Sequence, residues 1–280
     1  MSLQKEHNKQ EDFFNKIEIP YSKSKNDVWN SISESLENDE SGIKNPVKNI
    51  IMYSVAAVLF FLIGMTGFMR FYSNEFYAHK GQHLSAILPD GSEVNLNAQT
   101  YLRYHPYWWR FSREVELKGE VFFKVKKGKR FAVISDEGTT SVLGTSFNIF
   151  ARQTVYKVHC ITGKVQVISR GNDIQILKPK QSLTISDNKI KTVREDDKIN
   201  DAVAWIDNRF VFTGTPLNEV FEELERQFDI HININDEVTD LYSGNFKRGS
   251  SPDEILDIIC KPFGLTYKKV TTNTYEIKKQ

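Results

Sequence analysis

The stretch IIMYSVAAVLFFLIGMTGF, residues 50–68, decides how the rest of the chain is organised. It carries no charged side chain, and Lys48 and Arg70 bound it. A helix of about 19 residues is about 28 Å long, close to the roughly 30 Å hydrocarbon core of a bilayer. A buried core helix of a soluble protein is the alternative, but such a helix usually has a polar face, and nothing here is more polar than serine or threonine. The run therefore predicts a transmembrane helix at 50–69.

The position of this run favours an uncleaved anchor that crosses the membrane once. The 49 residues that precede it are more than a secretory signal peptide has before its apolar region. The flanking charges do not decide the orientation, because Lys44 and Lys48 before the run are balanced by Arg70 and Lys80 after it. The sequence thus predicts a single-pass membrane protein with a short first segment and a long second one.

Composition narrows the classes of function. The 37 basic residues nearly balance the 36 acidic ones, and the net charge of +1 lacks the basic excess expected of a nucleic-acid-binding protein. Cys160 and Cys260 have no CxxC spacing, so we expect two buried free thiols rather than a zinc or redox site.

The first segment, 1–49, is polar but contains two apolar groups of residues. One is a cluster at 13–17, and the other follows one face of a helix at spacings i, i+1, i+4 and i+8, with Ser24 or Asn26 as its cap. A helix lying on the membrane is an alternative, but four acidic residues between 34 and 40 would be repelled by anionic lipid. We therefore expect a partner protein to bury these side chains: Phe13, Phe14, Ile17, Val28, Trp29, Ile32 and Leu36.

Short strands separated by turn residues come after a linker expected at 70–82. HLSAIL and SEVNLN, joined by Pro89-Asp90-Gly91, predict a hairpin, and REVELK and EVFFKV, on either side of Gly119, predict a second pair. Similar runs continue every 8 to 12 residues or so, which is typical of an all-β sandwich or roll, here at 83–195. We expect the rings of one aromatic block to fill its core rather than form an exposed recognition patch: Tyr104, Tyr107, Trp108, Trp109 and Phe111.

The last region, 209–280, comes after a second linker at 196–208 and contains an internal repeat. FVFTGTPLNEVFEELERQFDIHI (210–232) aligns with NFKRGSSPDEILDIICKPFGLTY (245–267). Ser251 and Glu254 have the spacing of a capping box, and a proline is expected at the first position of each helix. The repeat predicts a small α+β domain of two strand-helix-strand units.

The sequence shows no pattern that carries catalysis. HExxH, P-loop, GxGxxG and GxSxG motifs are absent, and the six histidines have no ligand spacing. We therefore expect no enzyme, no cofactor and no metal site.

Four runs resemble the FecR family of membrane-bound anti-sigma factors: LPDGSEVNLNAQTYLRY (88–104), REVELKGEVFFKV (113–125), VLGTSFNIFA (142–151) and GKVQV (163–167). The repeat from Phe210 resembles the carboxy-terminal domain that accompanies FecR, which is similar to the secretin and TonB short N-terminal domain.

The resemblance implies an inner-membrane protein with a cytoplasmic N-terminus and a periplasmic C-terminus. It further implies that 1–49 holds an extracytoplasmic-function sigma factor in the cytoplasm, and that the periplasmic part senses the signalling domain of a TonB-dependent outer-membrane transporter. The apolar helical face in 1–49 is the surface expected to bind the sigma factor. The alternative is a bitopic periplasmic scaffold or docking protein of an outer-membrane complex.

Overall fold

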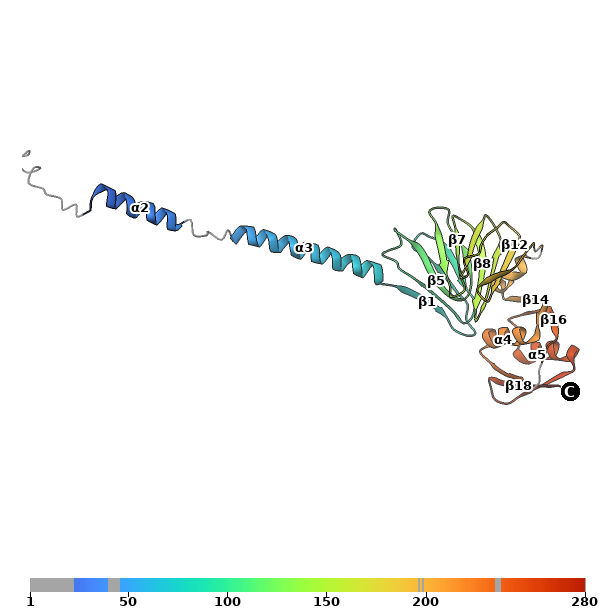
Figure 1. The fold of residues 1–280 in the computed structure, drawn as a ribbon. Coiled ribbons are helices and arrows are strands. Elements are labelled where there is room, and N and C mark those ends of the chain that lie inside the picture. The colour runs from blue at the N-terminus through green and yellow to red at the C-terminus, as the bar shows by residue number, and fades with distance from the viewer. Residues whose placement is uncertain (1–22, 40–45, 196, 198, 235–237, 280) are drawn as a thin grey trace, which may run out of the picture. The chain divides into compact units, whose positions relative to one another are not determined.

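The structure is a computed structural model that describes residues 23–39, 46–195, 197, 199–234 and 238–279 (Figure 1). The chain divides into two units, 1–64 and 65–280. The predicted order of an N-terminal helix, one apolar helix, a large β-domain and a small α+β region is confirmed.

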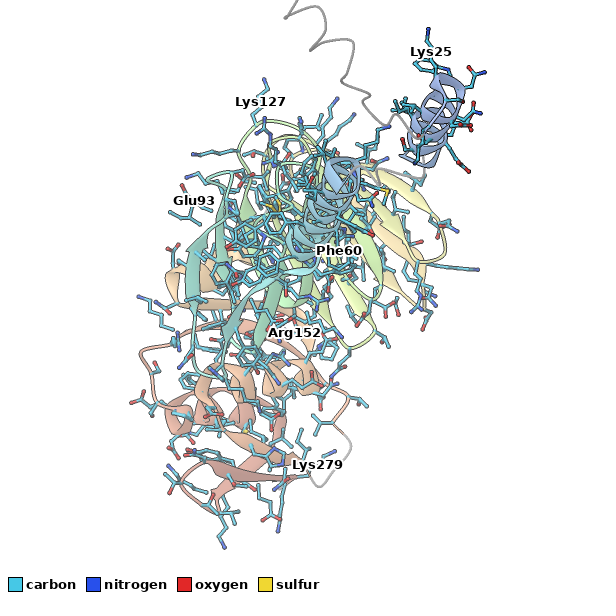
Figure 2. The ribbon with its side chains drawn as sticks, turned by 90° about the vertical axis from the view of Figure 1, so that its left-hand side faces the viewer. Lys25, Phe60, Glu93, Lys127, Arg152 and Lys279 are labelled. Atoms are coloured by element: carbon cyan, nitrogen blue, oxygen red, sulfur yellow. The ribbon has the colours of Figure 1, made fainter. Side chains whose placement is uncertain are left out.

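Two helices come first. Helix α2 spans Lys25–Asp39, and Ser24 caps it as predicted, because the backbone N–H of Asp27 donates to Ser24 Oγ at 3.3 Å. Helix α3 spans Pro46–Phe71. Among the described residues, Val47–Phe71 is the one helix long and apolar enough to cross a membrane, and its most apolar window buries nothing inside the protein. Phe60, labelled in Figure 2, is 80% exposed on this helix.

The prediction of a linker at 70–82 is wrong for about half of that range. Strand β1 (Asn74–Ala78) pairs antiparallel with β4 (Thr100–Tyr104) through all five of its residues. Its alternate side chains face inward, and the ring of Phe76 stacks on that of Tyr104 with centroids 5.6 Å apart. Only Tyr72 and Ser73 therefore separate α3 from the first sheet.

The β-domain has two sheet layers that share one strand. One layer has the order β1-β4-β5-β6-β7-β10-β11. The other has the order β2-β3-β5-β8-β9-β12-β13. All of these pairs are antiparallel except β5 with β6. The further strands are β2 (Leu84–Ile87), β3 (Glu93–Leu96), β5 (Arg113–Lys124), β6 (Phe131–Ile134), β7 (Gly138–Val142), β8 (Ser146–Arg152), β9 (Val155–Cys160), β10 (Val165–Ser169), β11 (Ile174–Leu177), β12 (Gln181–Ser186) and β13 (Lys189–Glu195).

Strand β5 corrects the second predicted hairpin. Gly119 does not turn the chain back. Instead β5 runs through it as one strand of 12 residues, pairing with β4 and β6 before Gly119 and with β3 and β8 from Gly119 onward. Gly119 has a φ of 118°, and a Cβ there would lie 2.7 Å from the Cα of Thr100. Glycine is needed where the strand passes from one layer to the other at this close approach. The β2–β3 hairpin is confirmed, with Gly91 at a φ of 77°.

The core lies between the two layers. The Phe123 ring stacks on that of Phe147, with centroids 5.0 Å apart, and packs in a T-shaped arrangement with that of Phe131, from the other layer, at 5.9 Å. The aromatic block divides between core and surface: Tyr104 and Trp109 are buried as predicted, whereas Tyr107 and Phe111 are exposed, so the prediction is wrong for these two.

The linker predicted at 196–208 forms a 3-10 helix, η1 (Ile199–Asp207). Its Ile199 and Trp205 are buried, and Trp205 joins the core of the C-terminal region. Apolar packing, rather than a free linker, thus connects the β-domain to the C-terminal region.

The C-terminal region contains the two predicted strand-helix-strand units. The first is β14 (Arg209–Pro216), α4 (Leu217–Phe228) and β15 (His231–Ile234), and the second is β16 (Leu241–Lys247), α5 (Pro252–Cys260) and β17 (Leu265–Lys269), followed by β18 (Thr274–Lys279). The strands form a β14-β16 pair and a β15-β18-β17 sheet.

The two units differ at the start of their helices. The capping box of Ser251 and Glu254 is present, with Pro252 at the first position of α5. In the first unit Pro216 is instead the cap residue of α4 and the last residue of β14, so the prediction of a first-position proline is wrong there. The apolar stripe of α4 is buried as expected, with Leu217, Val220, Phe221 and Leu224 at most 1% exposed.

Candidate functional site

Helix α2 presents an uncovered apolar face. Trp29 is 69% exposed, Ile32 45% and Leu36 64%, while Val28 is half-buried. The sequence spacing places these four side chains on one side of the helix. Large apolar side chains at helical spacing are the features by which an amphipathic helix enters the groove of a partner. Phe13, Phe14 and Ile17 lie outside the described residues.

A second feature lies where the β-domain meets the C-terminal region, in the unit 65–280. We call it the interdomain polar cluster. It consists of buried or half-buried polar side chains from the approach to β2, the β3–β4 turn, β5, β8 and α4: His83, Asn97, Glu120, Asn148, Arg152, Glu223, Arg226 and Gln227. Figure 2 labels Arg152 at this end of the β-domain.

Gln227 connects the two sides of the cluster. Its Nε2 donates to Asn97 Oδ1 and to Glu223 Oε1, both at 2.7 Å, and its Oε1 accepts from His83 Nε2 at 2.9 Å. Asn97 in turn donates to Glu120 at 2.8 Å. A continuous chain of hydrogen bonds thus runs from α4 into β5, and because its members are buried or half-buried, water does not readily replace a hydrogen bond that is lost.

The two carboxyls of the cluster differ in acidity. Burial raises the pKa of Glu120, and the negative charge of nearby Glu223 raises it further. Burial would also raise the pKa of Glu223, but the positive charges of Arg226 and Arg152, with hydrogen bonds from Gln227 and Arg226, hold it below its ordinary value. Glu223 therefore carries the negative charge, and Glu120 is the carboxyl that takes up a proton first.

Apolar contacts and a cavity accompany the polar cluster. Phe122, two residues beyond Glu120, shares its face of β5 and packs against the core of the C-terminal region. A cavity of about 550 Å³ lies beside the cluster, lined among others by Arg152, Lys157, Arg209 and Glu219. Its lining mixes both signs of charge. The arrangement is suited to joining two domains, and the described residues contain no group of three or more side chains that could hold a metal ion.

The sequence matches two protein-family models. The model described as "FecR protein" matches residues 75–166, and that described as "FecR, C-terminal" matches residues 209–277, so that the two together cover more than half of the chain. The chain belongs to the FecR family. The matched residues lie in the β-domain and in the C-terminal region, which the interdomain polar cluster connects.

Solved structures agree with this assignment. Two crystal structures of a candidate anti-sigma factor from Parabacteroides distasonis ATCC 8503 are similar to this FecR-family chain. One has 29% identity and a TM-score of 0.68 and covers 74% of this chain and 99% of its own. The other has 28% identity and a TM-score of 0.69 and covers 75% and 100%. Among curated proteins, none matches the chain.

Sequence reasoning missed the interdomain polar cluster of this FecR-family protein. One local signal was present: Phe122 lies between two residues of β5 that face the sandwich core, and so must point to the other face of the strand. A large apolar side chain there indicates that this face is covered. No local pattern shows that α4, about 100 residues further along the chain, covers it.

Proposed function

We propose that this FecR-family anti-sigma factor holds an extracytoplasmic-function sigma factor through helix α2. The observation that carries the proposal is the exposed face of Trp29, Ile32 and Leu36, on a helix that precedes the one candidate membrane span of the described residues. An isolated helix of this length is marginal in water, so a partner that covers this face would also stabilise the helix. A sigma factor held in this way is kept from RNA polymerase.

The proposed topology places α2 in the cytoplasm, α3 across the inner membrane, and the two FecR-matching regions in the periplasm. The sigma factor and RNA polymerase are cytoplasmic, so an anti-sigma surface before the span requires this orientation. Membrane-impermeant maleimide should label Ile174→Cys in spheroplasts and Ser31→Cys only after lysis. The reverse pattern would refute the topology.

We further propose that a TonB-dependent outer-membrane transporter provides the signal through its periplasmic signalling domain. Strands β14 and β16 form a two-stranded sheet and, among the described residues, pair only with each other. Each therefore offers an edge to which a partner could add a strand. The FecR C-terminal match covers these strands. Full-length protein should be retained on the immobilised signalling domain of its transporter, and no retention would remove this part of the proposal.

The test of sigma binding uses the full chain in cells. Truncating Trp29 and Ile32 to alanine removes two exposed anchors worth together roughly 2 to 4 kcal/mol, which corresponds to an affinity loss of about 30- to 1,000-fold. The double variant should lose its sigma factor on co-purification and raise transcription of a sigma-dependent reporter. The matched control, Asn30→Ala with Glu34→Gln, changes the opposite face of α2 and should do neither.

The two variants also distinguish the proposal from a periplasmic scaffold. A scaffold would leave α2 idle, so neither variant would alter sigma retention or transcription. Equal behaviour of the double variant and the control, with both proteins present at normal levels, would favour the scaffold.

A further inference from the structure

The turn after β4, residues 105–112, carries large aromatic side chains on the surface of the β-domain. Its backbone is fixed by hydrogen bonds from the N–H groups of Phe111 and Ser112 to the carbonyl oxygen of Trp108, at 2.9 and 3.1 Å. Trp109 points inward, where its ring packs in T-shaped arrangements with those of Tyr104 and Phe131.

Because Trp109 anchors the turn in the core, its neighbours are directed outward. Tyr107 is 51% exposed and Phe111 68%, and Trp108 is half-buried. Trp108 and Phe111 pack on each other with ring centroids 4.7 Å apart. The turn therefore presents a group of rings to its surroundings rather than one isolated side chain.

These rings contact the end of helix α3, within the same unit of the chain. The Tyr107 ring lies 6.0 Å from that of Phe68 and 5.2 Å from that of Tyr72. The backbone carbonyl of Tyr72 is hydrogen-bonded to His105 Nδ1 at 3.0 Å. The turn is thus attached to the residues at which the apolar helix ends.

Two positively charged side chains accompany these rings. The Arg70 guanidinium lies over the Trp108 ring, 5.8 Å from its centroid, and Arg110 is exposed in the same turn. Rings with a polar edge, together with arginine, are the side chains that gather at the level of lipid head groups, where the rings meet the acyl boundary and the cations meet phosphate. Phe68 and Tyr72, which contact the turn, are exposed, and so is Phe71 at the end of α3. Together with the turn they form an apolar surface that exceeds the scattered single residues of an ordinary soluble surface.

We propose that the 105–112 turn is a second membrane contact of this protein, which lies in the head-group layer of the bilayer that α3 spans. The partner is the lipid surface itself, because the rings continue directly from the membrane end of α3. Tyr107, Trp108 and Phe111 enter the interface, and Arg70 and Arg110 contact phosphate. The turn then fixes the β-domain against the bilayer. This inference depends on the membrane span and not on sigma binding.

The test measures the depth of single nitroxide labels on the full chain in lipid nanodiscs. Labels are attached at Tyr107→Cys and Phe111→Cys, and the matched control is Ile174→Cys, an apolar side chain 61% exposed on β11, at the opposite edge of the layer from β1. Both native thiols are buried, and burial raises the pKa of each to about 11, so they react slowly with the label.

At Tyr107 and Phe111 we expect faster relaxation by oxygen, which concentrates in lipid, than by a water-soluble nickel chelate. The control label should show the opposite preference. The proposal is overturned if the two turn labels collide with the chelate as readily as the control label does. It is also overturned if they are protected from both reagents, because the turn would then be covered by protein. Agreement of the two turn positions guards against a local disturbance by either substitution.

Discussion

Gln227→Ala is expected to uncouple the C-terminal region from the β-domain. The substitution removes the hydrogen bond to the ionised Glu223, worth about 1.5 to 3 kcal/mol, and two neutral ones, to Asn97 and His83, worth about 1 kcal/mol each. Asn97 Oδ1 keeps another donor, the N–H of Ala98 at 2.8 Å, whereas the half-buried His83 loses the hydrogen bond between its Nε2 and Gln227 Oε1. The expected loss in free energy of unfolding is therefore roughly 3 to 5 kcal/mol.

Calorimetry of the purified full chain measures this loss. For a protein of this size a loss of 3 to 5 kcal/mol lowers Tm by roughly 6 to 20 °C. Because the bonds to Asn97 and His83 cross between the two domains, we also expect the transition of the C-terminal region to separate from that of the β-domain. Gln166→Ala, on the exposed side of β10, is the matched control and should melt like the unaltered protein.

A double-mutant cycle with Asn97→Ala distinguishes coupling between domains from damage to α4 alone. Residues that share a hydrogen bond show non-additive effects, so the combined variant should lose less than the sum of the two single losses. Additive losses, or a Gln227→Ala protein that melts in one transition at the normal temperature, would refute the reasoning.

Three further outcomes are expected. Gly119→Ala should lower the free energy of unfolding of the β-domain by at least about 2 kcal/mol in denaturant titration, because it combines a positive φ with a clash against Thr100. Gly249→Ala, where a Cβ would meet open space, is the control and should leave the stability unchanged. Equal stabilities of the two variants would contradict this prediction. Ser251→Ala removes the α5 cap and should cost about 1 kcal/mol, and no loss would show that the capping box contributes nothing. Since burial raises the pKa of Glu120 above 4.5, the carboxyl of the folded protein holds a proton that the unfolded chain releases. The free energy of unfolding should therefore fall as pH rises through that raised pKa. Glu120→Gln should flatten this part of the pH profile of stability, and an unchanged slope would contradict the prediction.

Local patterns predicted the elements whose cause is local. The uncharged run indicated helix α3, the Asp-Gly pair indicated the β2–β3 hairpin, and the Ser251 and Glu254 spacing indicated the start of α5. In the hairpin and in α5 the stabilising interaction lies within a few residues of sequence. For α3 it is the apolar surroundings that an uncharged run of this length requires.

Long-range packing decided the rest. Gly119 is equally compatible with a turn and with a kinked strand, and only the pairing of β5 with four other strands shows which occurs. The sequence predicted a linker around Trp205, because the side chains that bury this ring belong to the core of the C-terminal region and leave no local pattern. The alternation of core and surface at Tyr107, Trp109 and Phe111 is likewise set by the turn, which composition does not reveal.

The short connection between α3 and β1 limits where this protein can be cut. A protease that binds its substrate as an extended strand needs several residues free on either side of the bond it cleaves. Only Tyr72 and Ser73 lie between the helix and the β1–β4 ladder, and the Tyr72 backbone is itself held by His105. Cleavage next to the membrane therefore requires β1 to peel away from β4 first, so the resistance of this bond to proteolysis reports directly on how firmly the sheet edge is closed.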